Sequence, residues 1–196
     1  DHRDLHLSIR RQRQMCIRDS AKRMLEIHSK AYKEQYGSNF ICMIPTNIYG
    51  PHDNFHLDDA HVIPALIHKC YLAKQEGKPF IVRGTGSPLR QFIYSEDLAK
   101  LMMWTLEKYE ENDSIILSVS EKDEVSIGKI AELIAEEFDY LDNMKYDTNY
   151  SDGQYKKTAD NSKLMKLYGN YSFISIEDGI KKNVQWFKKN YDICRK

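Results

Sequence analysis

The sequence predicts an α/β protein whose strands are mainly parallel. Short runs of apolar and aromatic residues alternate along the chain with longer segments in which apolar residues recur every three or four positions. This alternation favours parallel strands, because a crossover helix returns the chain to the side of the sheet where the next strand starts. Serine residues stand directly before several helical segments, where a side-chain oxygen accepts from free backbone N–H groups.

The first part of the chain contains two predicted helices separated by a strand and a long polar loop. The first helix covers residues 21–36 and ends at Gly37, a residue type that is common just after helices. A short strand follows at 39–44. Residues 45–60 are rich in Pro, Asn, Asp and His, and loops of this length are often functional. The second helix covers residues 61–76.

The later elements follow at short intervals. We predict strands at 80–82, 91–94, 115–119 and 145–148, and helices capped by Ser95, Ser126 and Ser175. The last helix covers residues 176–189, and Asp178 stands at its third position, as in a capping box. Residues 149–160 are predicted to form a polar loop.

Composition excludes several classes of function. Lysine plus arginine and aspartate plus glutamate both total 29, so the formal net charge is zero, which argues against nucleic-acid binding but permits a local phosphate-binding patch. No apolar run reaches the roughly 18 to 20 residues that cross a bilayer, so we expect no membrane association. The four cysteines lack zinc-site spacing, so we expect free thiols and no metal site. Without an apolar secretory signal, a cytoplasmic location is expected.

The beginning of the chain differs from the rest. Residues 1–19 are rich in arginine and contain no lysine, whereas lysine is frequent after Ala21. We expect residues 1–19 to be non-native or disordered. The chain also contains no Gly-x-Gly-x-x-Gly or Gly-x-x-Gly-x-x-Gly turn, which a complete dinucleotide-binding fold uses to bring backbone N–H groups to the pyrophosphate. Either the protein binds no dinucleotide, or the half that carries this turn is missing.

One long motif points to a family. Residues 44–55 read Ile-Pro-Thr-Asn-Ile-Tyr-Gly-Pro-His-Asp-Asn-Phe. This motif resembles the signature of the GDP-L-fucose synthases, which belong to the extended short-chain dehydrogenases. Four further segments agree with that family in order and spacing, at residues 61–66, 84–95, 123–127 and 151–158. The resemblance covers residues 20–196, about the carboxy-terminal half of such an enzyme.

The resemblance implies a fold and an activity. It implies the carboxy-terminal portion of an extended short-chain dehydrogenase, with a partial Rossmann sheet and a smaller substrate-binding domain. Residues 20–60 would be the remnant of the NADP-binding domain, and residues 61–196 mainly the GDP-sugar-binding domain. Such enzymes epimerise GDP-4-keto-6-deoxy-D-mannose at C3 and C5 and reduce its C4 ketone with NADPH, giving GDP-L-fucose. They are typically homodimers. We expect this chain alone to be inactive.

The resemblance also assigns cofactor and catalytic residues. Lys22 stands at the lysine of a Tyr-x-x-x-Lys motif, where it would hold the nicotinamide ribose. Arg18 replaces the tyrosine, and a group whose pKa is above about 12 cannot serve as that general acid near neutral pH. His61 is implied as the acid of the epimerisation and as a cofactor contact. The remaining implied contacts with NADP(H) are Pro45, Thr46, Asn47 and Ile48.

The implied contacts with the GDP-sugar come from four other residues. Arg90 would bind the diphosphate, because a guanidinium fork matches phosphate oxygens. Lys69, about two helical turns after His61, and Asp152 are placed on the substrate as well. Arg83 stands where many family members have a tryptophan.

Two other interpretations remain open. A related nucleotide-sugar 4-epimerase or dehydratase shares the fold, and residues 51–55 are the discriminating feature. A non-catalytic sugar-nucleotide-binding module would keep the substrate site without a redox step. A glycine-rich turn encoded upstream would separate that module from the synthase.

Overall fold

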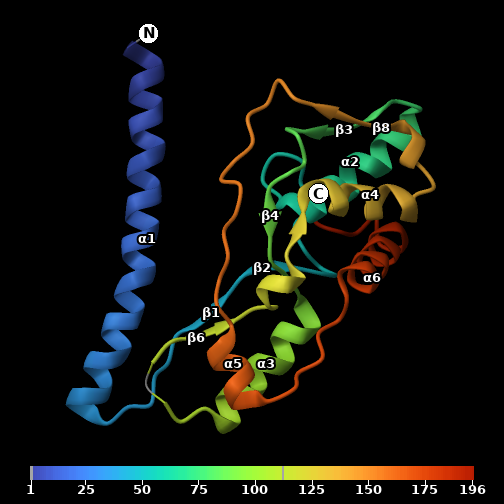
Figure 1. The fold of residues 1–196 in the computed structure, drawn as a ribbon. Coiled ribbons are helices and arrows are strands. Elements are labelled where there is room, and N and C mark those ends of the chain that lie inside the picture. Colours follow the sequence, from blue (N-terminus) through green and yellow to red (C-terminus); the bar gives the residue numbers. More distant parts are fainter. Residues whose placement is uncertain (1, 112) are drawn as a thin grey trace. The chain divides into compact units, whose positions relative to one another are not determined.

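The computed structural model describes the backbone of residues 2–111 and 113–196, and side chains from Ile17 onward except those of residues 18 and 112. The chain divides into two compact units (Figure 1). The first contains Asp1–Ile44 and Leu106–Ile115, and the second contains Pro45–Thr105 and Ile116–Lys196. This division by compactness does not test the predicted functional boundaries at residues 20 and 61, which stay predictions.

Helix α1 (His2–Tyr36) makes up most of the first unit. It ends where the sequence predicts, because Gly37 adopts φ 67° and its N–H donates to the carbonyl of Lys33 over 2.9 Å. It begins earlier than predicted, because its backbone is helical from His2. The expectation that residues 1–19 are disordered stays a prediction. No glycine or proline interrupts this stretch, which is why one helix can continue through it. The non-native origin of residues 1–19 stays a prediction.

The strands pair in twos. Two pairs are parallel, as predicted: β2 (Asn47–Tyr49) with β5 (Phe92–Tyr94), and β3 (Phe80–Arg83) with β8 (Met144–Asp147). The other pairs are β1 (Met43–Pro45) with β6 (Ile115–Leu117), and antiparallel β4 (Leu89–Arg90) with β7 (Val125–Ser126).

The prediction of an uninterrupted loop at residues 45–60 was wrong, because β2 lies inside it. Only one residue of β2, Tyr49, is buried, so the segment lacks the apolar alternation that marks a strand. Its pairing with β5, more than 40 residues later, supplies the order that the local sequence does not show.

The helices of the second unit match the predictions closely. They are α2 (Val62–Glu76), α3 (Ser95–Lys108), which extends into the first unit, α4 (Ile127–Glu137), α5 (Ser162–Tyr168) and α6 (Ile176–Lys189). Ser126 and Ser175 cap α4 and α6, accepting from the N–H groups of Lys129 (3.0 Å) and Asp178 (3.1 Å). Ser95 is the first residue of α3 instead of its cap. The sequence did not predict α5, which has only seven residues.

The core of the second unit lies between α2, α4 and α6. Ile67, Ile134 and Phe187 from these helices are fully buried, and each such side chain contributes about 1.5–3 kcal/mol of hydrophobic stabilisation. Phe55, in the loop before α2, is also fully buried, and its N–H donates to the carbonyl of Arg195 over 2.8 Å. The loop before α2 is therefore fixed to the carboxy-terminal segment.

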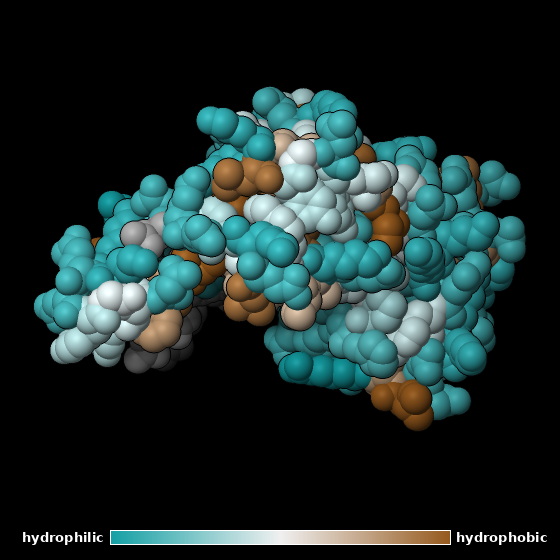
Figure 2. All heavy atoms as spheres, turned by 90° about the horizontal axis from the view of Figure 1, so that it is seen from below, coloured by the Kyte–Doolittle hydropathy of each residue, from teal (hydrophilic) through white to brown (hydrophobic). Residues whose placement is uncertain are grey.

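One face of the molecule is largely hydrophilic. Figure 2 shows this face, on which hydrophobic residues form separate small groups among hydrophilic ones. Among the described residues, no helix is both long and apolar enough to cross a membrane.

Candidate sugar-nucleotide site

A cleft of about 260 Å³ opens in the second unit. Four residues that the sequence singled out line it together, although they lie far apart in the chain: Asn47, Arg83, Arg90 and Asp152. The rest of the lining consists of small, apolar or loop residues: Val62, Gly86, Pro88, Ile127, Ser151 and Gly153. The fold thus gathers much of the predicted substrate site around one concavity.

The turn after β3 requires glycine at the edge of this cleft. Gly84 adopts φ 86°, and a Cβ there would lie 2.3 Å from Oδ1 of Asp152. Gly86 adopts φ 76°, and its Cβ would lie 3.0 Å from the Cα of Gly128. Side chains other than hydrogen would therefore push Asp152 and the start of α4 away from the turn.

Asp152 is bound to this turn. Its Oδ1 accepts from the Thr85 N–H over 3.0 Å, and its Oδ2 accepts from the Thr85 hydroxyl over 2.5 Å. The carboxylate thereby fixes the loop at 149–160 against the end of β3. Its predicted contact with substrate stays a prediction.

Cationic side chains gather near the cleft. Arg83 ends β3, and its guanidinium stacks on the ring of Tyr150, 4.6 Å from the ring centroid. Burial lowers the pKa of Lys69, and the nearby charge of Arg83 lowers it further, while Asp58 acts in the opposite direction. Lys69 is not among the lining residues, but its charge is close enough to interact with Arg83.

Arg90 is oriented by backbone oxygens. Its Nη1 donates to the carbonyls of Leu89 (2.6 Å) and Tyr155 (3.4 Å), which occupy one nitrogen and leave the other side of the guanidinium available. Within the part of the chain that the structure describes, neither Arg83 nor Arg90 forms an ion pair with a carboxylate. The one carboxylate among the described lining residues, that of Asp152, is bonded to Thr85, so two guanidinium groups and one carboxylate leave the cleft with a net positive charge that suits an anion.

Four of the predicted cofactor residues, Pro45, Thr46, Asn47 and Ile48, lie on β1, β2 and the segment between them. The Asn47 amide donates to the carbonyl of Gln91 over 2.8 Å, and the Thr46 hydroxyl donates to the Ser118 hydroxyl over 3.1 Å. Pro45 and Ile48 are exposed. Of this predicted set, only Asn47 lines the cleft.

His61 begins α2 as predicted, as its N-cap residue, but its side chain makes no capping hydrogen bond. It is exposed and does not line the cleft, although the next residue, Val62, does. Its charge lowers the pKa of Asp53, against the larger effect of burial, which raises it. The catalytic role of His61 stays a prediction.

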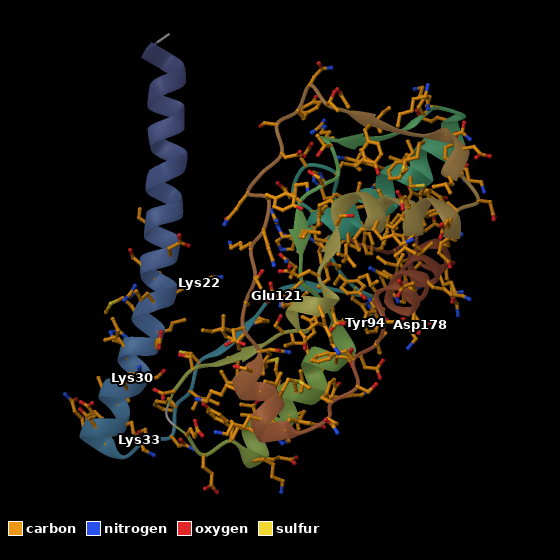
Figure 3. The ribbon with its side chains drawn as sticks, in the orientation of Figure 1. Lys22, Lys30, Lys33, Tyr94, Glu121 and Asp178 are labelled. Atoms are coloured by element: carbon orange, nitrogen blue, oxygen red, sulfur yellow. The ribbon has the colours of Figure 1, made fainter. Side chains whose placement is uncertain are left out.

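Lys22 lies on α1, in the first unit (Figure 3), and is exposed. The predicted substitution at Arg18 concerns a side chain outside the described residues. No group of three or more His, Cys, Asp or Glu residues among those described has the arrangement of a metal site.

Several residues of the site were missed from the sequence. Tyr150 and Tyr155 flank Asp152 in the polar loop, and Thr85 and Gln91 hold that loop in place. Aromatic residues beside a Ser-Asp-Gly turn were the one signal that could have identified the two tyrosines.

Comparison with known proteins identifies the family. The profile of the NAD dependent epimerase/dehydratase family matches residues 19–120. The chain belongs to this family.

Named relatives point to one branch of it. The chain is 53% identical over 176 residues to GDP-L-fucose synthase of Dictyostelium discoideum, covering 90% of this chain and 55% of that protein. It is 35% identical to GDP-L-fucose synthase of Escherichia coli, covering 85% of this chain and 54% of that protein. The chain therefore spans about half the length of the curated relatives it matches.

Solved structures agree with the fold. The crystal structure of a GDP-L-fucose synthetase from Naegleria fowleri has a TM-score of 0.87 and 46% identity, covering 90% of this chain and 56% of that one. The dTDP-glucose 4,6-dehydratase of Bacillus anthracis, at 19% identity and a TM-score of 0.69, shares the fold. The predicted α/β class and its extended short-chain dehydrogenase architecture are confirmed.

Proposed function

We propose that this chain forms the GDP-sugar-binding part of a GDP-L-fucose synthase. The enzyme would epimerise GDP-4-keto-6-deoxy-D-mannose at C3 and C5 and reduce its C4 ketone with NADPH. The observation that carries the proposal is the cleft lined by both Arg83 and Arg90, neither of which forms an ion pair with a carboxylate among the described residues. A diphosphate offers the oxygen pairs that a guanidinium fork recognises.

The relatives support the choice of nucleotide sugar. Those that match at 53% and 43% identity are named GDP-L-fucose synthase and probable GDP-L-fucose synthase. Within the proposal, Arg90 binds the diphosphate, Arg83 and Lys69 add positive charge, and Asp152 contacts the substrate. Many family members have a tryptophan at the position of Arg83. Because Arg83 stacks on Tyr150, this position offers a flat surface as well as a positive charge.

NADPH is the proposed cofactor, and the Naegleria fowleri relative has been solved bound to NADP. When bound, NADPH supplies the hydride for the C4 ketone. Pro45 and Ile48 expose apolar surface that suits a nicotinamide ring, and the Asn47 amide is held in place by Gln91, so this segment fits the cofactor. Lys22 would hold the nicotinamide ribose. The sequence contains no glycine-rich turn for the pyrophosphate.

His61 is the proposed acid of the epimerisation. The C4 ketone acidifies the protons at C3 and C5, so inversion needs a base on one face of the sugar and an acid on the other. Histidine is the side-chain type most often used as a general acid near neutral pH. His61 is exposed at the start of α2, one residue from the cleft wall, and its ring is not used in capping the helix.

The same proposal places the enzyme in the cytoplasm as a homodimer. Cys42, Cys70 and Cys194 are free thiols, as expected in a reducing compartment. Helix α1 exposes large apolar side chains, including those of Leu25 and Tyr36, which a partner surface would cover.

Calorimetric titration of the chain with GDP tests the binding part of the proposal. We expect saturable binding, and we expect Arg90→Ala to raise the Kd about 10- to 100-fold, because a charge-assisted hydrogen-bond pair contributes about 1.5–3 kcal/mol. Lys163→Ala, a change of a lysine on α5, is the control and should bind GDP normally. Absence of GDP binding, or equal binding by the Arg90 variant, would refute the proposed site.

A further inference from the structure

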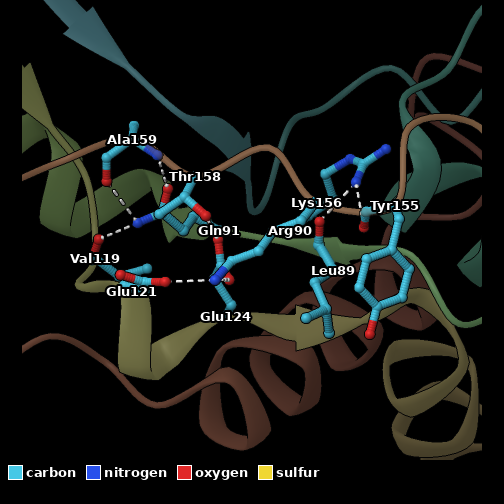
Figure 4. A network of polar contacts seen from close by, with 10 residues as sticks. All are labelled: Leu89, Arg90, Gln91, Val119, Glu121, Glu124, Tyr155, Lys156, Thr158 and Ala159. Carbon is cyan, nitrogen blue, oxygen red and sulfur yellow. Dashed lines mark hydrogen bonds and ion pairs between the residues drawn. The ribbon is translucent and has the colours of Figure 1, made fainter.

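One buried glutamine next to a cleft residue joins two other segments of the chain. Gln91 follows Arg90 and is 1% exposed. Its Nε2 donates to the carbonyls of Val119 (2.8 Å) and Ala159 (3.0 Å), and its Oε1 accepts from the Ala159 N–H over 2.7 Å (Figure 4). Both N–H donors and the oxygen of the carboxamide are therefore used, and two of the three bonds hold the backbone of one residue of the polar loop, Ala159.

We call the hydrogen bonds between the Gln91 side chain and Ala159 the Gln91 clamp. The polar loop runs along β4 from the cleft to this clamp. The Leu89 N–H donates to the carbonyl of Tyr155 over 2.7 Å. Lys156 pairs with Glu121 and, over 3.4 Å, with Glu124. Figure 4 shows the contacts of Lys156 together with the hydrogen bonds of Gln91.

The loop supplies one of the two carbonyl oxygens that orient the Arg90 side chain. Tyr155 presents its carbonyl to Nη1 of Arg90, so a shift of the loop removes one of the two oxygens that orient the guanidinium. A free arginine side chain carries about 2 kcal/mol of rotamer entropy, and preordering it lowers the entropy lost when an anion binds. At the other end of the loop, Asp152 holds the turn at Thr85.

We propose that Gln91 is a positioning residue for sugar-nucleotide binding, acting through Ala159 and Tyr155 on Arg90. The inference rests on the proposed function, because it assumes that Arg90 binds the diphosphate. The backbone carbonyl of Gln91 separately accepts from the Asn47 amide, and substitutions of the glutamine side chain leave that group in place.

Gln91→Leu tests the clamp, because leucine keeps an apolar volume in the buried site and removes all three hydrogen bonds. We expect the Kd for GDP to rise about tenfold, which corresponds to about 1.4 kcal/mol. In an Arg90→Ala background the same change should have little further effect, because the two residues act in one chain of contacts. A loss of stability alone would not produce this dependence on Arg90.

Tyr171→Phe is the matched control. It removes the hydrogen bond from the Tyr171 hydroxyl to Asp97 (2.8 Å), in a part of the second unit that does not line the cleft, and should lower stability without changing GDP affinity. If Gln91→Leu does not fold, Thr158→Val loosens the same loop from an exposed position by removing its bond to Glu124, and should weaken GDP binding in the same direction.

The outcomes separate the two claims. If the unaltered chain does not bind GDP, the proposed function fails. If the unaltered chain binds GDP and Gln91→Leu binds equally well, or weakens binding by the same factor with and without Arg90, the positioning role is overturned. If Thr158→Val is the variant used, an unchanged affinity for GDP would also overturn the positioning role.

Discussion

Replacing Gly84 with alanine should damage the cleft through Asp152. Gly84 adopts φ 86°, where an alanine costs about 1–2 kcal/mol. Its Cβ would also lie 2.3 Å from Oδ1 of Asp152, so the carboxylate must move and lose its two bonds to Thr85. Charge-assisted bonds contribute about 1.5–3 kcal/mol when shielded and less at an exposed site, so we expect a total loss of about 2–4 kcal/mol in the free energy of unfolding.

Gly77→Ala is the control that isolates the contact with Asp152. Gly77 has a similar left-handed φ of 63°, but a Cβ there would meet nothing within 4 Å. It should therefore cost only the backbone part, about 1–2 kcal/mol. Urea unfolding gives both stabilities, and calorimetry should show GDP affinity reduced for Gly84→Ala alone. Equal losses of stability in the two variants, with GDP affinity unchanged in both, would refute the coupling between this turn and the cleft.

Two further predictions concern stability. Burial lowers the pKa of His68, whose Nδ1 lies 2.8 Å from the Phe55 carbonyl, so the unfolded chain binds a proton more readily than the folded chain and stability should fall as pH drops below about 6.5. His68→Gln should flatten this pH dependence in urea titrations at about pH 5 to 7. A pH dependence that is unchanged in the variant would contradict the prediction. Ser175→Ala should destabilise the protein by about 1 kcal/mol, because the Asp178 N–H loses its acceptor. The control Ser172→Ala should have no such effect, and equal melting temperatures for the two variants would contradict the capping role of Ser175.

The sequence predicted the helices better than the strands, for physical reasons. The ends of α4 and α6 are set by local chemistry, since a serine hydroxyl caps each one, and local chemistry is visible in the sequence. Strands β2, β4 and β7 have two or three residues each and are ordered by partners distant in the chain. Pairing of that kind leaves little periodic signal.

The candidate site divides in a similar way. Motif resemblance selected Asn47, Arg83, Arg90 and Asp152, and the fold places all four around one cleft. Gln91 could not be selected, because its role depends on Ala159, 68 residues later, and on its own burial. Neither property follows from a glutamine at the start of a short predicted strand.

A crystal structure of the chain with GDP would test the central claim most directly. We predict that the diphosphate oxygens lie about 3 Å from the guanidinium nitrogens of Arg90, within the cleft shared by Arg83, Asn47 and Asp152. GDP bound elsewhere on the protein, or with its diphosphate turned away from both arginines, would contradict the proposed site.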